Sequence, residues 1–254
     1  VLNMNYAAVD RGLQSVEEIR VPDSWKDLPD EPLEQTEAAG VPDYVRDVLI
    51  PVNAQAGDKI PVSKFLSFAD GVTEVETSKY EKRGIAVDVP QWLPDNCIGC
   101  NQCSLVCPHA AIRPVLLTEE EKAGAPESFV TVPAKGLGKD APAYSFRMQV
   151  SPYDCLGCGV CLTACPAKGA LEMVPFETQR EQQPNFDNYA MNEKLLKKDI
   201  ISDKSVKTAQ FAKPYFQFSA ACAGCAETTY IKLVTQLFGS RMYVANASGC
   251  SSAY

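Results

Sequence analysis

Eight of the eleven cysteines occur in two copies of one pattern with the spacing C-x2-C-x2-C-x3-C-P. The first copy consists of Cys97, Cys100, Cys103 and Cys107, and the second of Cys155, Cys158, Cys161 and Cys165. This spacing is typical of segments that bind a pair of [4Fe–4S] clusters, where the fourth thiolate of each copy binds the other copy's cluster. The pattern therefore predicts one cluster on Cys97, Cys100, Cys103 and Cys165, and another on Cys155, Cys158, Cys161 and Cys107.

Two other uses of these cysteines are less consistent with the pattern. Zinc takes four ligands, which would leave the third and fourth cysteines of each copy without a role. A disulfide framework is typical of oxidising compartments and of much shorter chains. Pro108 and Pro166 follow the fourth cysteines, and proline suits a chain that leaves a cluster loop because it fixes φ and donates no hydrogen bond.

A third cysteine group lies near the end of the chain. Cys222 and Cys225 stand between an expected strand over 214–218 and an expected helix, and Cys250 follows a second expected strand over 242–245. Strand, helix, strand begins an α/β domain, and open α/β sheets bind ligands in loops beyond the carboxyl ends of their strands. On spacing alone, a third iron–sulfur cluster, a zinc site, a redox-active pair and inert thiols all remain open.

The sequence also predicts elements around these motifs. A helix after Cys225 presents an apolar face of Ile231, Val234, Leu237 and Phe238 and ends at Gly239. Glu227 suits the first turn of this helix, because the helix dipole stabilises a negative charge there. Elsewhere we expect a helix capped by Thr118, strands over 144–150 and 171–175, and a helix around 191–200. The charge run in 80–86 is typical of a solvated face. His109, the only histidine, suits a packed structural role better than a hydrogen bond to a cluster.

Composition limits the possible partners and compartments. The 254 residues carry a formal net charge of −8, and bound clusters add negative charge, so nucleic acid is not expected as a partner. No apolar run is long enough to cross a membrane, and no signal peptide is visible. Eleven cysteines favour a reducing, anaerobic cytoplasm. Because the chain starts without methionine and stops after a glycine-cysteine pair, we expect an internal piece of a longer polypeptide rather than a short protein with processed ends.

Several segments together resemble the pyruvate:ferredoxin oxidoreductase family of 2-oxoacid oxidoreductases. They are Asn5–Asp10 (NYAAVD), Tyr80–Ala86 (YEKRGIA), Cys107–Arg113 (CPHAAIR), Ala221–Thr228 (ACAGCAET) and Asn246–Ser252 (NASGCSS). The resemblance covers essentially the whole chain and is more specific than the doubled cysteine pattern alone.

The resemblance implies cofactors that the spacing alone does not give. The doubled motif would form an inserted domain with two clusters, and Cys222, Cys225 and Cys250 would supply three of four ligands to a third [4Fe–4S] cluster beside thiamine diphosphate. The fourth ligand is expected beyond Tyr254. Glu227 and Cys250 match positions that also contact thiamine diphosphate. The segment that holds Mg²⁺ and the diphosphate is absent, so the chain alone is not expected to turn over substrate.

The resemblance further implies a multi-domain α+β and α/β architecture. We expect the tail of an α/β domain over 1–37, a linking domain over 38–86, a ferredoxin-like domain over 87–195 and the start of a thiamine-binding α/β domain over 196–254. The implied enzyme is a homodimer that converts pyruvate and coenzyme A to acetyl-CoA and CO₂ and reduces ferredoxin or flavodoxin. A ferredoxin-like electron-transfer module is the alternative, and a zinc-binding interaction protein is a third hypothesis.

Overall fold

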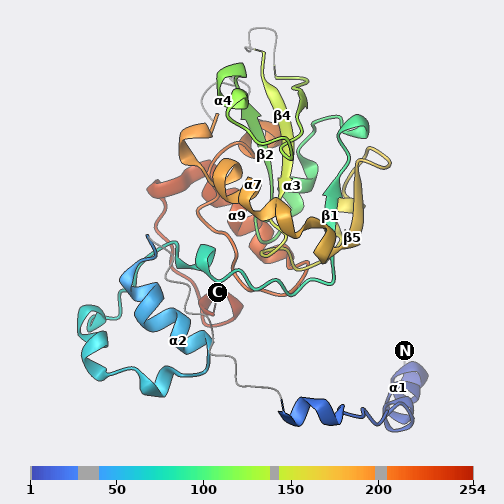
Figure 1. The fold of residues 1–254 in the computed structure, drawn as a ribbon, viewed down its shortest axis with the longest axis vertical. Coiled ribbons are helices and arrows are strands. Elements are labelled where there is room, and N and C mark those ends of the chain that lie inside the picture. Colours follow the sequence, from blue (N-terminus) through green and yellow to red (C-terminus); the bar gives the residue numbers. More distant parts are fainter. Residues whose placement is uncertain (1, 28–39, 138–142, 198–204, 254) are drawn as a thin grey trace. The chain divides into compact units, whose positions relative to one another are not determined.

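The computed structural model describes residues 2–27, 40–137, 143–197 and 205–253 (Figure 1). The chain divides into two compact units, Val1–Val41 and Pro42–Tyr254. The first unit contains helix α1 (Leu2–Gln14) and the 3-10 turn η1 (Asp23–Asp27). Many of its large apolar side chains, among them Tyr6 and Trp25, are exposed. The described residues of this unit therefore do not bury a core of their own.

The second unit opens with short helical turns. A π-helix, η2 (Val45–Leu49), continues into α2 (Ile50–Asn53), and three 3-10 turns follow. These turns are η3 (Gly57–Lys59), η4 (Val62–Phe68) and η5 (Thr77–Tyr80). Val45 and Val48 are buried, and the Tyr44 and Phe68 rings pack edge to face with centroids 4.8 Å apart. Aromatic and aliphatic packing thus holds this segment together without a sheet.

Two antiparallel sheets carry the cysteine motifs. One pairs β1 (Asp88–Trp92) with β5 (Leu171–Pro175), and the other has the order β2 (Ile112–Leu117), β4 (Ser145–Val150), β3 (Val132–Pro133). The first motif runs from β1 to β2 and the second from β4 to β5. Each motif therefore connects one sheet to the other, and strand pairing across the repeats brings the two motifs together. The expected strands over 144–150 and 171–175 are confirmed.

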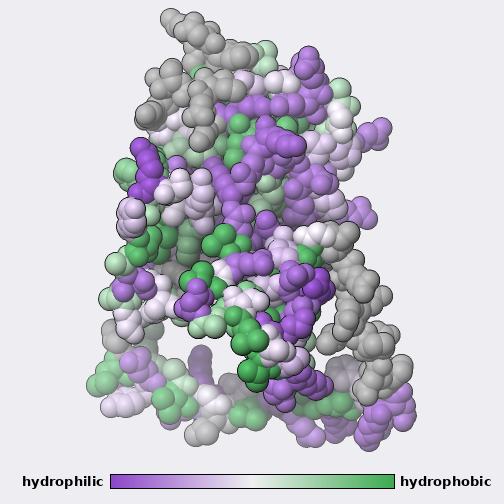
Figure 2. Space-filling view, turned by 90° about the vertical axis from the view of Figure 1, so that its left-hand side faces the viewer, coloured by the Kyte–Doolittle hydropathy of each residue, from purple (hydrophilic) through white to green (hydrophobic). Residues whose placement is uncertain are grey.

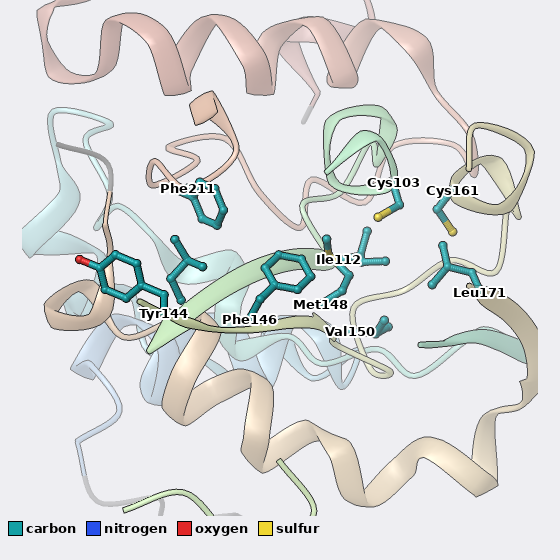
Figure 3. Close-up of a cluster of buried hydrophobic side chains, with 10 residues drawn as sticks. Cys103, Ile112, Tyr144, Phe146, Met148, Val150, Cys161, Leu171 and Phe211 are labelled. Carbon is teal, nitrogen blue, oxygen red and sulfur yellow. The ribbon is translucent and has the colours of Figure 1, made fainter. Parts of the chain in front are cut away.

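The main core lies between β2, β4 and the cysteine helices. Ile112, Phe146 and Met148 from β2 and β4 are each at most 4% exposed. Figure 3 shows Cys103 and Cys161 at one end of this cluster, where Leu171 of β5 lies. Cys103 belongs to α3 (Gln102–Val106) and Cys161 to α5 (Val160–Thr163). The cysteines thus form one end of the hydrophobic core.

Helices and turns surround the sheets. Thr118 caps α4 (Glu119–Ala123) as expected, because its hydroxyl accepts from the Glu121 N–H while the Glu121 carboxylate accepts from the Thr118 N–H. The remaining helices are α6 (Phe176–Gln179), α7 (Gln183–Asn185), α8 (Val206–Ala209) and α9 (Ala226–Phe238). The helix from 226 to 238 and its end at Gly239 confirm the expectation.

Three expected elements are wrong. The expected helix around 191–200 is replaced by the π-turn η8 (Phe186–Ala190) and the 3-10 turn η9 (Glu193–Leu195), and residues 198–200 lie outside the described residues. The expected strands over 214–218 and 242–245 are irregular. A strand needs a neighbour for its backbone hydrogen bonds, and neither sheet of the described chain includes these segments.

Hydrophobic residues remain visible among hydrophilic ones on the face shown in Figure 2. Within Pro42–Tyr254, the exposed apolar residues include Val62, Leu66, Val72 and Val75. Among the described helices, none is long and apolar enough to cross a membrane.

A second hydrophobic cluster contains Phe186, Leu117, Phe218 and other buried residues. A substitution of Phe186 tests how much this cluster contributes to stability. The Phe186 side chain is fully buried, so Phe186→Ala should lower the free energy of unfolding by about 3–5 kcal/mol. Anaerobic denaturant unfolding would measure the change. Phe65→Ala is the control, since Phe65 is 43% exposed and should cost less than about 1 kcal/mol. Equal costs for the two variants would contradict the assignment of Phe186 to the core.

Candidate metal centres

The loops of the two cysteine motifs have the same backbone shape. Gly99 and Gly157, at equivalent positions, have φ of 66° and 67°. Their N–H groups donate to the sulfur of the first cysteine in each motif, Cys97 and Cys155, at 3.4 Å in both loops. Positive φ is readily adopted by glycine. The glycines therefore allow a tight loop in which a backbone N–H faces a cysteine sulfur.

A second left-handed residue starts the helix of each motif. Asn101, with φ of 61°, precedes α3, and Gly159, with φ of 71°, precedes α5. The buried Asn101 amide also donates to the Lys207 carbonyl at 3.0 Å. Each helix carries the third cysteine on its first turn, and the fourth follows its end. The helix therefore moves the fourth cysteine away from the other three.

Cys107 lies with the first three cysteines of the second motif. Cys107, Cys155, Cys158 and Cys161 all line one cavity, together with Pro108 and His109. Burial raises the pKa of Cys161 to about 12, with added contributions from Cys107, Cys155 and Cys158. Burial likewise raises the pKa of Cys155 to about 12, again with a contribution from Cys107. Four cysteines that line one cavity fit the donor set of a [4Fe–4S] cluster.

The cysteines of the first motif form a neighbouring set. Burial raises the pKa of Cys103 well above its usual range, and Cys161, Cys97 and Cys100 add to the rise. Cys97 and Cys165 both pack against the hydrophobic core that includes Cys103. Cys161 belongs to the other motif and to the same hydrophobic cluster as Cys103, so the two donor sets adjoin.

The thiols are not arranged for a single ion. All eleven cysteines are free, and within the described residues no three His, Cys, Asp or Glu side chains come close enough to hold one metal ion. In a [4Fe–4S] cluster each thiolate binds a different iron, so its ligands stand further apart than those of zinc.

The third cysteine group is only partly assembled. Cys225 immediately precedes α9, and its N–H donates to the Cys222 carbonyl at 3.1 Å. Hydrogen bonds from the start of α9, led by the Thr228 backbone, lower the pKa of Cys225. Cys222 and Cys250 are exposed, and no interaction within the described part of the chain joins Cys250 to the other two. Glu227 is exposed on the first turn of α9.

The buried face of α9 differs from the expected one. Val234, Leu237 and Phe238 are 38–53% exposed, whereas Thr228 and Lys232 are at most 1% exposed. A polar face therefore packs inward, whereas the apolar face is mostly uncovered by the described residues, with Ile231 half-buried. Amphipathic periodicity could not reveal this, because it assigns the apolar side to the interior.

Lys82 is a second residue whose position the sequence did not reveal. The charge pattern in 80–86 predicts a solvated face, but Lys82 donates to Asp154 at 2.7 Å and to Asp187 at 3.1 Å. The Asp154 side chain is 3% exposed. In the sequence, Asp154 directly precedes Cys155. The Gly84 N–H also donates to the Tyr153 carbonyl at 2.8 Å. This part of the run therefore anchors the second motif.

Comparisons with known proteins support the cluster interpretation. Residues 96–170 match the family described as a 4Fe-4S dicluster domain, and residues 30–86 match the EKR family, a domain of unknown function. The first match covers both cysteine motifs.

The whole chain is also similar to longer enzymes. It is 54% identical to the pyruvate:ferredoxin oxidoreductase of Moorella thermoacetica and 46% identical to the pyruvate-flavodoxin oxidoreductase of Klebsiella pneumoniae. Each comparison covers 100% of this chain and 21% of the relative. The mitochondrial pyruvate dehydrogenase [NADP(+)] of Euglena gracilis is 42% identical over 100% of the chain and 14% of that protein. The chain therefore spans about a fifth of the length of the first two relatives.

Gly157→Ala should impair the second cysteine loop more than Gly99→Ala impairs the first. Both substitutions force a residue with a Cβ into the left-handed region, at a cost of about 1–2 kcal/mol. At Gly157 the new Cβ would also lie 3.0 Å from the Asp88 carbonyl oxygen, whereas nothing lies within 4 Å at Gly99. Iron per polypeptide should fall further in Gly157→Ala. Equal iron in the two variants would contradict this difference between the loops.

Proposed function

We propose that this chain is part of a pyruvate:ferredoxin or pyruvate-flavodoxin oxidoreductase, in which it carries electrons away from the reaction centre. The similarity of the whole chain to such enzymes supports this proposal. The single observation that carries it is the cavity where Cys107 joins Cys155, Cys158 and Cys161, because this exchange of fourth ligands is typical of two adjoining [4Fe–4S] clusters.

The proposed ligand sets follow the exchange. Cys155, Cys158, Cys161 and Cys107 would hold one cluster, and Cys97, Cys100, Cys103 and Cys165 the other. When bound, the clusters accept and release one electron at a time. The chain's own residues would hold them at one end of the hydrophobic core, where the buried strands β2 and β4 would keep water away. The Gly99 and Gly157 N–H groups, which face ligand sulfurs, would raise the reduction potentials.

We propose a third [4Fe–4S] cluster on Cys222, Cys225 and Cys250, with a fourth ligand from a part of the enzyme beyond this chain. Cys225 and Cys222 already share one turn, which supports their joint use. For Cys250 to join them, residues 242–253 would take another position once paired with strands that lie outside this chain. The uncovered apolar face of α9 supports such a further layer.

The activity of the whole enzyme is also a proposal. It would convert pyruvate and coenzyme A to acetyl-CoA and CO₂ with thiamine diphosphate and Mg²⁺, and would reduce ferredoxin or flavodoxin as a homodimer in a reducing cytoplasm. Glu227 and Cys250 would contact the thiamine diphosphate, and both are exposed in this chain. The domains over 1–37, 38–86, 87–195 and 196–254 remain predictions. A plain electron-transfer module is less well supported, because the match continues through the third cysteine group.

Iron and acid-labile sulfide per full polypeptide, purified without oxygen, test the number of clusters. Three clusters would give about 12 of each, and two would give about 8. A value near 8 would limit the clusters to the doubled motif and favour an electron-transfer module. A value near zero would overturn the iron–sulfur proposal altogether.

Cys225→Ser should remove the third cluster while leaving the two clusters of the doubled motif detectable by electron paramagnetic resonance. Pyruvate-dependent reduction of ferredoxin should then be lost, because electrons could no longer reach the other clusters. Ser240→Ala, at an exposed position after the same helix, is the matched control and should behave as wild type. Normal ferredoxin reduction by Cys225→Ser would contradict the assignment.

A further inference from the structure

Lys232 is a buried lysine on α9 whose ammonium group meets the end of α3. Only 1% of the surface of Lys232 is exposed. The Nζ atom donates to three backbone carbonyl oxygens, those of Ser104, Leu105 at 3.0 Å and Cys107 at 2.9 Å. Thus a residue 125 positions downstream of Cys107 binds the backbone of that cysteine directly.

The three contacts match the charged form of lysine. An ammonium group has three donors and no acceptor, and here each donor has one carbonyl partner. The last carbonyls of a helix are not fully paired within it and carry partial negative charge, although that of Ser104 also accepts from the Cys107 N–H at 3.3 Å. Within the described residues, no carboxylate lies at ion-pair distance from Lys232. Its positive charge is therefore balanced by carbonyl dipoles and not by an opposite charge.

The charge lies close to one cysteine of each donor set. The Lys232 Nζ atom contacts the Cys107 carbonyl at 2.9 Å and the carbonyl of Ser104, the residue that follows Cys103. Cys107 belongs to the second predicted donor set and Cys103 to the first. Lys232 is thus within electrostatic range of a ligand of each set.

We propose that Lys232 is a positioning residue for electron transfer, which raises the reduction potentials of both clusters of the doubled motif and fixes α9 against them. This inference rests on the proposed function, since it requires those clusters to be bound. A cluster becomes more negative when it accepts an electron, so a nearby positive charge stabilises its reduced form. Burial strengthens the effect because the surroundings screen the charge less than water does.

The same residue connects the third cysteine group to the other two. Cys225 immediately precedes the helix that carries Lys232. Thr229, on the turn between them, donates its hydroxyl to the Val106 carbonyl at 3.2 Å. These contacts set how far the start of α9 lies from the Cys107 loop. Lys232 would therefore influence both the distance and the driving force of electron transfer from the third group.

Three substitutions separate charge from hydrogen bonding in the full, anaerobically purified polypeptide. Lys232→Arg keeps the charge, Lys232→Gln keeps donors without charge, and Lys232→Met removes both. Lys197→Met is the matched control, because Lys197 is also buried and pairs with Glu121 at 2.6 Å on another part of the fold. Iron per polypeptide is measured first, and midpoint potentials are then obtained by redox titration followed by electron paramagnetic resonance.

We expect Lys232→Gln and Lys232→Met to keep their iron and to show more negative midpoint potentials, with the larger shift at the cluster bound by Cys107. Lys232→Arg and Lys197→Met should titrate like wild type. Loss of iron in both neutral variants but not in Lys232→Arg would also support a need for the charge.

Unchanged potentials in an iron-replete neutral variant would overturn the proposal. Loss of iron in all three Lys232 variants would also overturn it and would make the residue a structural support only. Wild-type polypeptide without iron would instead refute the proposed function on which this inference rests, so the two failures are distinguishable.

Discussion

The position of Cys107 beside Cys155, Cys158 and Cys161 constrains most of this structure. A fourth cysteine can reach the opposite motif only if the two motifs lie side by side, and the pairing of β1 with β5 and of β2 with β4 produces that arrangement. The core between β2, β4 and the cysteine helices then ends at Cys103 and Cys161 (Figure 3). Hydrophobic packing and the proposed cluster binding therefore depend on the same strand register.

Charged residues attach the segments that precede and follow the doubled motif to the loops of the cysteines. Lys82 reaches Asp154 beside the second motif, and Lys232 reaches the Cys107 carbonyl at the end of the first. A buried charge that lacks partners is costly, so each of these contacts is sensitive to the loss of its partner. The segments before and after the doubled motif are thus attached at points that adjoin the cysteines. Changes in either segment would reach the proposed clusters through few contacts.

The two cysteine loops share a backbone but differ in their surroundings. Gly99 has open space where a Cβ would lie, whereas Gly157 is packed against the Asp88 carbonyl and Ala86. The cavity of the second donor set also includes His109, which is buried and whose Nδ1 lies 3.5 Å from the Ser219 hydroxyl. Clusters in these two environments would differ in hydrogen bonding and solvent exposure, which are the factors that separate reduction potentials.

The sequence by itself determined the elements whose causes are local. Cysteine spacing predicted the two motifs, Thr118 and Glu121 predicted a capped helix, and alternation predicted β4. Tertiary structure decided the features that depend on distant partners. Strands predicted over 214–218 and 242–245 are absent because no described strand pairs with them, and α9 buries Lys232 because carbonyls of Ser104, Leu105 and Cys107 accept from it. Periodicity cannot show this, since a polar face is buried only where another segment supplies hydrogen-bond acceptors.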